Sequence, residues 1–301
     1  AMVQAEPVTL ETGDAVGESS FTSGENWSDG AVPSSDKEYL VALGAEGLLR
    51  APVIFNEFRN EAWSGGSLTL GSDSAEGWLE LPISSTNAKP NIKVGTSKWY
   101  PYVSIADLTI KDAKDPTGAG GGVNMTKGLV ENCRITGCLS DKSHGGGAYM
   151  TGGTIRGTQF ENCIINALYQ HGNAVYLNGS SALVSNCVMT ANNGGYSHTT
   201  PAYGDAVVYL NSGTVAASRI YGNDKTSTPG VHQANGTLVN CLIYGNTGKN
   251  GSAGILKDNG TTAYCTVYGN VLTGDTSGLS GIRQTNGKTF NCIFYGNRKG
   301  T

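Results

Sequence analysis

Leu238-Val239-Asn240-Cys241-Leu242-Ile243-Tyr244-Gly245-Asn246 is the stretch that decides the fold, because its first half recurs along the chain. The phrase reads apolar or Thr, any residue, Asn, Cys, any residue, then Ile or Val. It returns at residues 130–135, 160–165, 184–189 and 289–294, with variants at 217–220 and 264–267. Aligned on its small residue, the copies lie 30, 24, 31, 23, 24 and 27 residues apart, at Cys133, Cys163, Cys187, Ser218, Cys241, Cys265 and Cys292. Uneven intervals of this length indicate stacked coils that keep their strands and vary their loops.

Two further signals divide each coil. Tyr-Gly-Asn occurs at 221–223, 244–246, 268–270 and 295–297, and Asn-Gly at 178–179, 235–236, 259–260 and 286–287. Glycine and Asn at these places are typical of turns. With the Asn-Cys bend they predict three strands and three turns per coil. The fold class expected is therefore all-β, a single-stranded right-handed parallel β-helix.

The bends also predict which residues are structural. Cys and the Ile or Val two residues later share one side of a strand, so both should point inward. We expect the cysteines at 133, 163, 187, 241, 265 and 292 to be buried, reduced and stacked. The Asn before each Cys suits a left-handed bend and an amide ladder between coils. On that interpretation, replacing Asn240 should weaken folding more than replacing Asn223.

Glycine-rich coil starts at 145–149 and 172–176 accompany these phrases. The combination resembles the parallel β-helix repeats of bacterial surface proteins, including polymorphic outer-membrane adhesins, over about two-thirds of the chain. Polysaccharide lyases share the fold, so the resemblance implies architecture more strongly than activity. It also implies a secreted protein or one on the outer surface of a bacterium.

The N-terminal part contains all four tryptophans, Trp27, Trp63, Trp78 and Trp99. Residues 23–33 resemble the opening of secreted bacterial β-helices, where a Trp covers the first coil. Trp27 is expected to cap the solenoid, and a Trp that stacks on a sugar is the alternative. Residues 1–50 are assigned to the cap and 51–301 to the β-helix, with irregular coils to about 105 and regular coils over 106–301. A full repeat at 292–297 predicts truncation at the C-terminus.

Composition limits the partners. The net charge is −4, charged residues make up 15% of the chain, and Lys or Arg never form a run. Nucleic acid is therefore not an expected partner, since it would need a basic surface. The chain also lacks an apolar stretch of the roughly 20 residues needed to span a bilayer.

The longest loop of the repeats, residues 190–205, concentrates reactive side chains. It contains Tyr196, His198, Tyr203 and Asp205, and adjacent coils supply Tyr169, His171, Asp224 and His232. His144 and His171 occupy equivalent places before a coil-starting glycine and should stack. Aromatic rings offer sugars a flat apolar surface, while His and Asp could bind hydroxyls. These residues form the first candidate ligand site.

The strand before Asn-Gly offers a second candidate surface. Tyr149, Tyr176 and Tyr209 align there, and the row continues as Gln233, Lys257 and Gln284. The neighbouring row, Val175, Val208, His232, Leu256 and Arg283, could face outward instead. A slip of one residue exchanges the two faces, so the sequence leaves this register open.

Two functions compete on this scaffold. Regular repeats without a charged cleft favour a non-enzymatic adhesin or glycan-binding stalk, with a polysaccharide or a host surface glycan as partner. That interpretation requires no metal and no cofactor. The alternative is a polysaccharide lyase or glycoside hydrolase acting on a long-chain glycan at the 190–205 loop, in which case Ca²⁺ is the expected cofactor.

Overall fold

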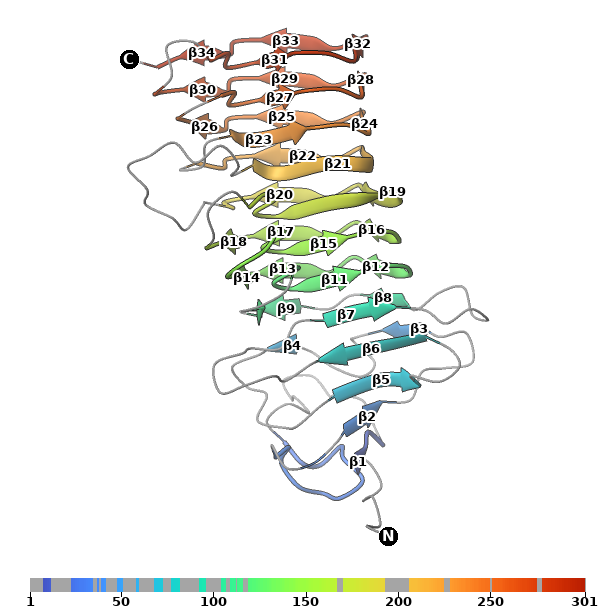
Figure 1. The fold of residues 1–301 in the computed structure, drawn as a ribbon. Coiled ribbons are helices and arrows are strands. Elements are labelled where there is room, and N and C mark those ends of the chain that lie inside the picture. The colour runs from blue at the N-terminus through green and yellow to red at the C-terminus, as the bar shows by residue number, and fades with distance from the viewer. Residues whose placement is uncertain are drawn as a thin grey trace.

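The structure is a computed structural model, and it shows a stack of parallel coils (Figure 1). It describes residues 8–11, 23–34, 37, 39–41, 48–50, 58–59, 68–72, 77–81, 92–95, 104–106, 109–111, 113–115, 119–166, 170–192, 206–224, 228–249, 251–274 and 278–300. All elements in this part are strands. The expected all-β parallel solenoid is confirmed.

The first two strands of each coil join one long sheet. First strands are β7 (Ile92–Gly95), β11 (Val123–Met125), β15 (Ala148–Met150), β19 (Val175–Ser185), β21 (Ala206–Ala216), β23 (Thr228–Gln233), β27 (Ile255–Lys257) and β31 (Ile282–Gln284). Second strands are β3 (Leu48–Arg50), β8 (Ser104–Ala106), β12 (Leu129–Glu131), β16 (Thr154–Arg156), β24 (Thr237–Val239), β28 (Thr261–Ala263) and β32 (Lys288–Phe290). The long strands β19 and β21 run through both positions. Elsewhere a turn separates the two strands, and Gly236, Gly260 and Gly287 occupy it with φ of 78°, 88° and 86°.

The third strands form a separate sheet. They are β4 (Phe58–Arg59), β9 (Thr109–Lys111), β13 (Arg134–Thr136), β17 (Gln159–Glu161), β20 (Val188–Thr190), β22 (Arg219–Tyr221), β25 (Leu242–Tyr244), β29 (Thr266–Tyr268) and β33 (Ile293–Tyr295). A short fourth strand of two residues follows in several coils. These are β10 (Lys114–Asp115), β14 (Leu139–Ser140), β18 (Ile164–Ile165), β26 (Thr247–Gly248), β30 (Val271–Leu272) and β34 (Arg298–Lys299).

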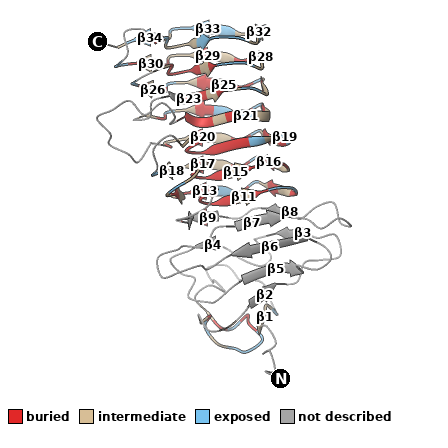
Figure 2. Ribbon diagram, in the orientation of Figure 1, coloured by how far each residue is buried: buried red, intermediate tan, exposed pale blue. Residues whose placement is uncertain are grey.

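Every pairing between successive regular coils is parallel, so each inward position becomes a row of equivalent side chains along the axis. On the third strands the middle residue points inward, as in Phe160, Met189 and Ile220, each fully buried. Figure 2 shows buried segments on the strands of the described coils up to β29, whereas β33 in the last coil is exposed. The core is therefore continuous rather than divided into separate units.

The first corner of each coil joins the second and third strands. A residue with positive φ comes first, at Asn132, Gly157, Asn186, Ala217, Asn240, Tyr264 and Asn291. A small residue pointing into the solenoid follows, at Cys133, Thr158, Cys187, Ser218, Cys241, Cys265 and Cys292. The serine hydroxyl and the cysteine thiols make similar hydrogen bonds at this corner. Ser218 Oγ donates to Ala216 O at 2.7 Å and accepts the Cys187 N–H at 3.1 Å, while Cys241 Sγ donates to Val239 O at 3.3 Å.

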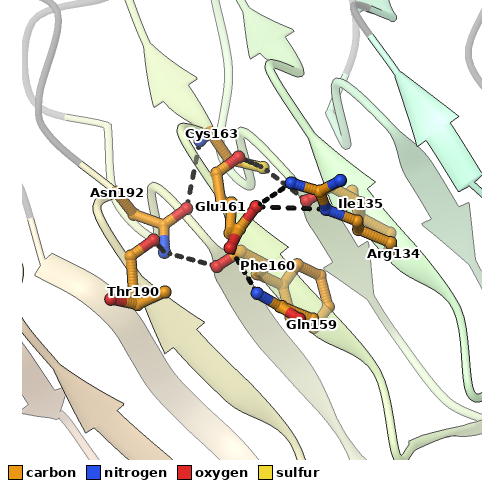
Figure 3. Close-up of polar contacts among 8 residues, drawn as sticks. All are labelled: Arg134, Ile135, Gln159, Phe160, Glu161, Cys163, Thr190 and Asn192. Atoms are coloured by element: carbon orange, nitrogen blue, oxygen red, sulfur yellow. Dashed lines mark hydrogen bonds and ion pairs between the residues drawn. The ribbon is translucent and has the colours of Figure 1, made fainter.

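The second corner, after the third strand, carries the asparagine ladder of Asn192, Asn223, Asn246, Asn270 and Asn297. Each Oδ1 accepts the backbone N–H of the preceding rung, beginning with Cys163 N–H to Asn192 Oδ1 at 3.0 Å. Asn192 Nδ2 donates to Phe160 O and Thr190 O, both at 3.0 Å (Figure 3). Asn192, Asn223, Asn246 and Asn270 are fully or almost fully buried. The ladder therefore satisfies backbone groups that the bend would otherwise leave unpaired.

Two sequence-based expectations about the corners are wrong. Residues 159–161 pair with 134–136 and 188–190, so Cys163 lies at the second corner beside Cys138, and Thr158 takes its expected place. Moreover, the buried amide ladder contains Asn223, whereas the side chain of Asn240 is exposed. Asn240 has the expected left-handed backbone, with φ of 53°. It supplies the bend, and its amide faces away from the core.

Six of the seven cysteines are buried, Cys292 is half-buried, and all seven are free thiols. The prediction of buried, reduced cysteines is thus confirmed for five of the six positions named and in part for Cys292. The expected stacking of all six in one row is wrong, because Cys163 lies at the second corner and the other five lie at the first. Burial raises the pKa of the Cys187 thiol to about 12, so it stays protonated at neutral pH.

The N-terminal part has a different topology. Strand β6 (Gly77–Leu81) is antiparallel to both β5 (Leu68–Ser72) and β7, so this segment is a meander and not the early coil expected from the sequence. Before it, β1 (Val8–Thr9) pairs with β2 (Tyr39–Val41), which pairs with β5. Trp27 is buried and belongs to the apolar core. The partly buried Val8 and Leu10 pack against that core. Its role as a cap stays a prediction.

Candidate functional site

The register that the sequence left open is resolved by the strand pairing. Tyr149, Tyr176 and Tyr209 are in register with one another and then with His232, Leu256 and Arg283. The inward row next to it is Met150, Leu177, Leu210, Gln233, Lys257 and Gln284. The row of Tyr149, Tyr176 and Tyr209 therefore faces outward, but it continues through His232, Leu256 and Arg283. The residues first proposed to continue it, Gln233, Lys257 and Gln284, belong to the inward row. The outward row places three tyrosines and a histidine on one surface.

Two more histidines pack on this row. The His144 ring lies 4.2 Å from that of Tyr176, and the His171 ring lies 4.2 Å from that of Tyr209. His144 and His171 are 5.5 Å apart with planes 4° from parallel, which confirms their predicted stacking. His232 meets Tyr209 edge-on at 4.7 Å. We call Tyr149, Tyr176, Tyr209, His144, His171 and His232 the aromatic ribbon.

The ring faces within the ribbon are directed at one another. Tyr149, Tyr176 and Tyr209 stack at 5.4 and 4.9 Å with planes within 17° and 3° of parallel, and only 8% of Tyr176 is exposed. The flat apolar surface expected for sugar stacking is therefore covered by neighbouring rings. A ligand would meet ring edges instead, where the hydroxyl and imidazole nitrogen atoms lie.

These edges continue into polar side chains. Asn178 Nδ2 donates to Tyr149 Oη at 3.1 Å, and Asn211 Nδ2 donates to Asn178 Oδ1 at 2.7 Å. The backbone N–H of His171 donates to His144 Nδ1 at 3.0 Å, so a neutral His144 carries its proton on Nε2. His232 Nε2 contacts the exposed Asp258 Oδ2 at 2.9 Å. The surface thus offers both donors and acceptors along the solenoid axis.

The charge of the ribbon is suppressed by its packing. Burial and the like charge of His171 lower the pKa of His144 to about 4. Burial, then the neighbouring tyrosines, raises the pKa of Tyr176 to about 12, and burial followed by Asp258 raises that of Tyr209. At neutral pH these three rings are uncharged. Asp258 at one edge contributes a negative charge.

The structure brings together only some of the predicted site residues. His171, Tyr176, Tyr209 and His232 meet in the ribbon, and His144, Tyr149 and Asp258 join them there. Tyr169, Tyr196, His198, Tyr203 and Asp205 lie outside the described residues. Asp224 lies elsewhere, in a bridge with Thr247 at the fourth-strand position. Asp258 comes two residues after Leu256 along the chain. The correct register would therefore have placed its side chain on the same outward side as Leu256.

Two other kinds of site would bear on function in the described part of the chain, a metal site and a membrane-spanning helix. No three His, Cys, Asp or Glu side chains gather there in an arrangement that could hold a metal ion. None of its elements is a helix long and apolar enough to cross a membrane.

Comparison with known proteins adds the family. The sequence model of a family described as "right handed beta helix region" matches residues 119–299, more than half of the chain. Searches of curated proteins and of solved structures found no match. The matched range contains the whole aromatic ribbon.

Proposed function

Because the chain belongs to the right-handed β-helix family, we propose that it is a non-catalytic glycan-binding protein of a bacterial surface. The aromatic ribbon is its contact surface. The fold suits a carbohydrate-related or surface protein, and the ribbon supplies the specific argument. A long glycan lying along the solenoid axis would meet one set of polar ring edges per coil.

The observation that carries this proposal is the outward register of the ribbon. Inward rows are committed to the core, whereas Tyr149, Tyr209 and His232 are half-buried and directed away from it. Their hydroxyl and imidazole groups, together with Asn178 and Asn211, could exchange hydrogen bonds with sugar hydroxyls. Because the stacked rings are already held in place, binding costs little side-chain entropy.

The test removes hydrogen-bonding atoms and keeps the rings. A variant carrying Tyr209→Phe and His171→Phe should bind glycans about tenfold more weakly, since each lost hydrogen bond contributes roughly 0.5–1.5 kcal/mol. Glycan-array binding, followed by titration calorimetry with the best ligand, measures this. Tyr264→Phe is the matched control, because Tyr264 is an exposed corner residue away from the ribbon. Equal weakening in both variants, or none in either, would contradict the proposal.

A polysaccharide lyase or glycosidase remains a separate outcome of the same screen. Those enzymes need carboxylates or a cationic base placed around the scissile bond. In the described part of the chain, the carboxylate that contacts the ribbon is that of Asp258, and it is paired with His232. Release of unsaturated or reducing ends from any bound polymer would replace the binding function with an enzymatic one.

A further inference from the structure

The third-strand sheet carries another row of aromatic side chains, formed by the Tyr-Gly-Asn phrases. Tyr221, Tyr244, Tyr268 and Tyr295 are in register on β22, β25, β29 and β33. Their rings stack at 4.7, 5.0 and 5.0 Å with planes within 9°, 2° and 1° of parallel. We call these four residues the tyrosine ladder. It belongs to a different sheet from the aromatic ribbon (Figure 1).

Strand alternation directs the ladder outward. The residues before the first three tyrosines, Ile220, Ile243 and Val267, are fully buried, whereas Phe294 before Tyr295 in the last coil is exposed. The tyrosines themselves are half-buried, and Tyr295 is exposed. As in the ribbon, each ring face covers the next, so the edges and hydroxyls project from the sheet. None of the four hydroxyls has a hydrogen-bond partner among the described residues.

Among the described residues, the outward row on one side of the ladder carries little charge. The outward row beside it is Arg219, Leu242, Thr266 and Ile293, so one charged side chain stands at its N-terminal end. The same face in earlier coils is different, because Arg134 Nε donates to Glu161 Oε2 at 3.1 Å and Gln159 also contacts Glu161 (Figure 3). Burial and the adjacent tyrosines raise the pKa of Tyr244, which keeps its hydroxyl neutral. In the row that becomes the ladder, Thr190 takes the place of Glu161 one coil before Tyr221.

We propose that the tyrosine ladder is a second binding surface, which takes one uncharged linear polysaccharide chain lying parallel to the solenoid axis. Rings about 5 Å apart repeat the hydroxyls at a nearly constant interval, as a polymer of sugar rings repeats its own hydroxyls. Moving a neutral chain from water onto side chains of little charge costs less desolvation free energy than moving a polyuronate there, because the carboxylates of a polyuronate would lack basic partners. With the ribbon on another sheet, one molecule could then hold two chains.

The test isolates the ladder from the ribbon. In the Tyr209→Phe, His171→Phe background, binding to insoluble cellulose and chitin is measured by pull-down, with polygalacturonate-coated beads as the charged comparison. Adding Tyr244→Phe and Tyr268→Phe keeps the stacked rings and removes two hydroxyls. We expect binding to at least one neutral polymer in the background protein, and about a tenfold loss after the two further substitutions.

Each outcome decides the matter. The ladder proposal is overturned if the background protein binds neither neutral polymer, prefers polygalacturonate, or binds equally well after the two further substitutions. Tyr264→Phe again controls for loss of an exposed hydroxyl, and melting temperatures show whether the fold is kept. Failure of the ribbon is seen separately, because the background protein would then bind every glycan as the unmodified protein does.

Discussion

In the coil of Asn240, the two corners use asparagine in opposite ways. At the first corner, Asn240 adopts the left-handed conformation and its side chain is exposed. At the second corner, Gly245 takes the left-handed position, with φ of 60°, and Asn246 after it is fully buried. One residue type therefore supplies backbone freedom at one bend and hydrogen bonds at the other. Position relative to the left-handed residue decides which role applies.

The largest expected effect comes from removing the buried asparagine side chain at the second corner. Asn223→Ala should destabilise the protein by about 3 kcal/mol or more, because it leaves the Asn192 N–H and two carbonyls without buried partners. Asn240→Ala should cost only about 1 kcal/mol, the penalty of a left-handed alanine. Melting temperatures of the two variants make the comparison. Equal losses would mean that the two corners are not chemically distinct.

A smaller effect is expected when a thiol is replaced by a hydroxyl at the first corner. Cys241→Ser should cost about 1 kcal/mol or less, since Ser218 already makes the equivalent hydrogen bonds one coil earlier. Cys163→Ser, at the second corner, should behave similarly. Thermal denaturation of both variants measures this, and a loss as large as that of Asn223→Ala would show that sulfur has a role beyond packing.

The fold could be predicted from the sequence because the repeats encode it redundantly. Every corner needs a left-handed residue followed by a small inward one, and Asn-Cys, Gly-Thr, Ala-Ser and Gly-Asn all satisfy that rule. The same redundancy caused the misalignment. Asn162-Cys163 fits either corner, and the true first corner of that coil, Gly157-Thr158, contains neither Asn nor Cys.

The candidate site was harder to predict, because it depends on register. Tyr209 is followed after 23 residues by His232 and after 24 by Gln233, and either could continue its row. The core gives no apolar signal there, since the inward row changes from Leu210 to Gln233 and Lys257. Lys257 is fully buried and Nζ donates to Thr262 Oγ1 at 3.2 Å and Thr289 Oγ1 at 3.0 Å. Polar residues whose hydrogen bonds are made inside the solenoid cannot be distinguished from surface residues by sequence alone.

A further expected effect concerns pH and the ribbon. The pKa of His144 is lowered to about 4 in the folded protein, below its ordinary value of 6.5, so the unfolded chain binds its proton more readily. Stability contributed by neutral His144 is present above pH 6.5 and is lost as the pH falls toward 4. His144→Gln should flatten the dependence of melting temperature on pH in this range. An unchanged slope would show that His144 is not held neutral by its packing.

The most direct measurement tests which face of the first strand is outward. In a Cys292→Ser background, Leu256→Cys and Ile255→Cys are each treated with a maleimide under native conditions. Leu256 is half-buried in the outward row, whereas Ile255 is fully buried in the core. We predict rapid labelling at position 256 and none at 255 until the protein is denatured. Labelling at 255 with protection at 256 would reverse the faces and remove the structural basis of the aromatic ribbon.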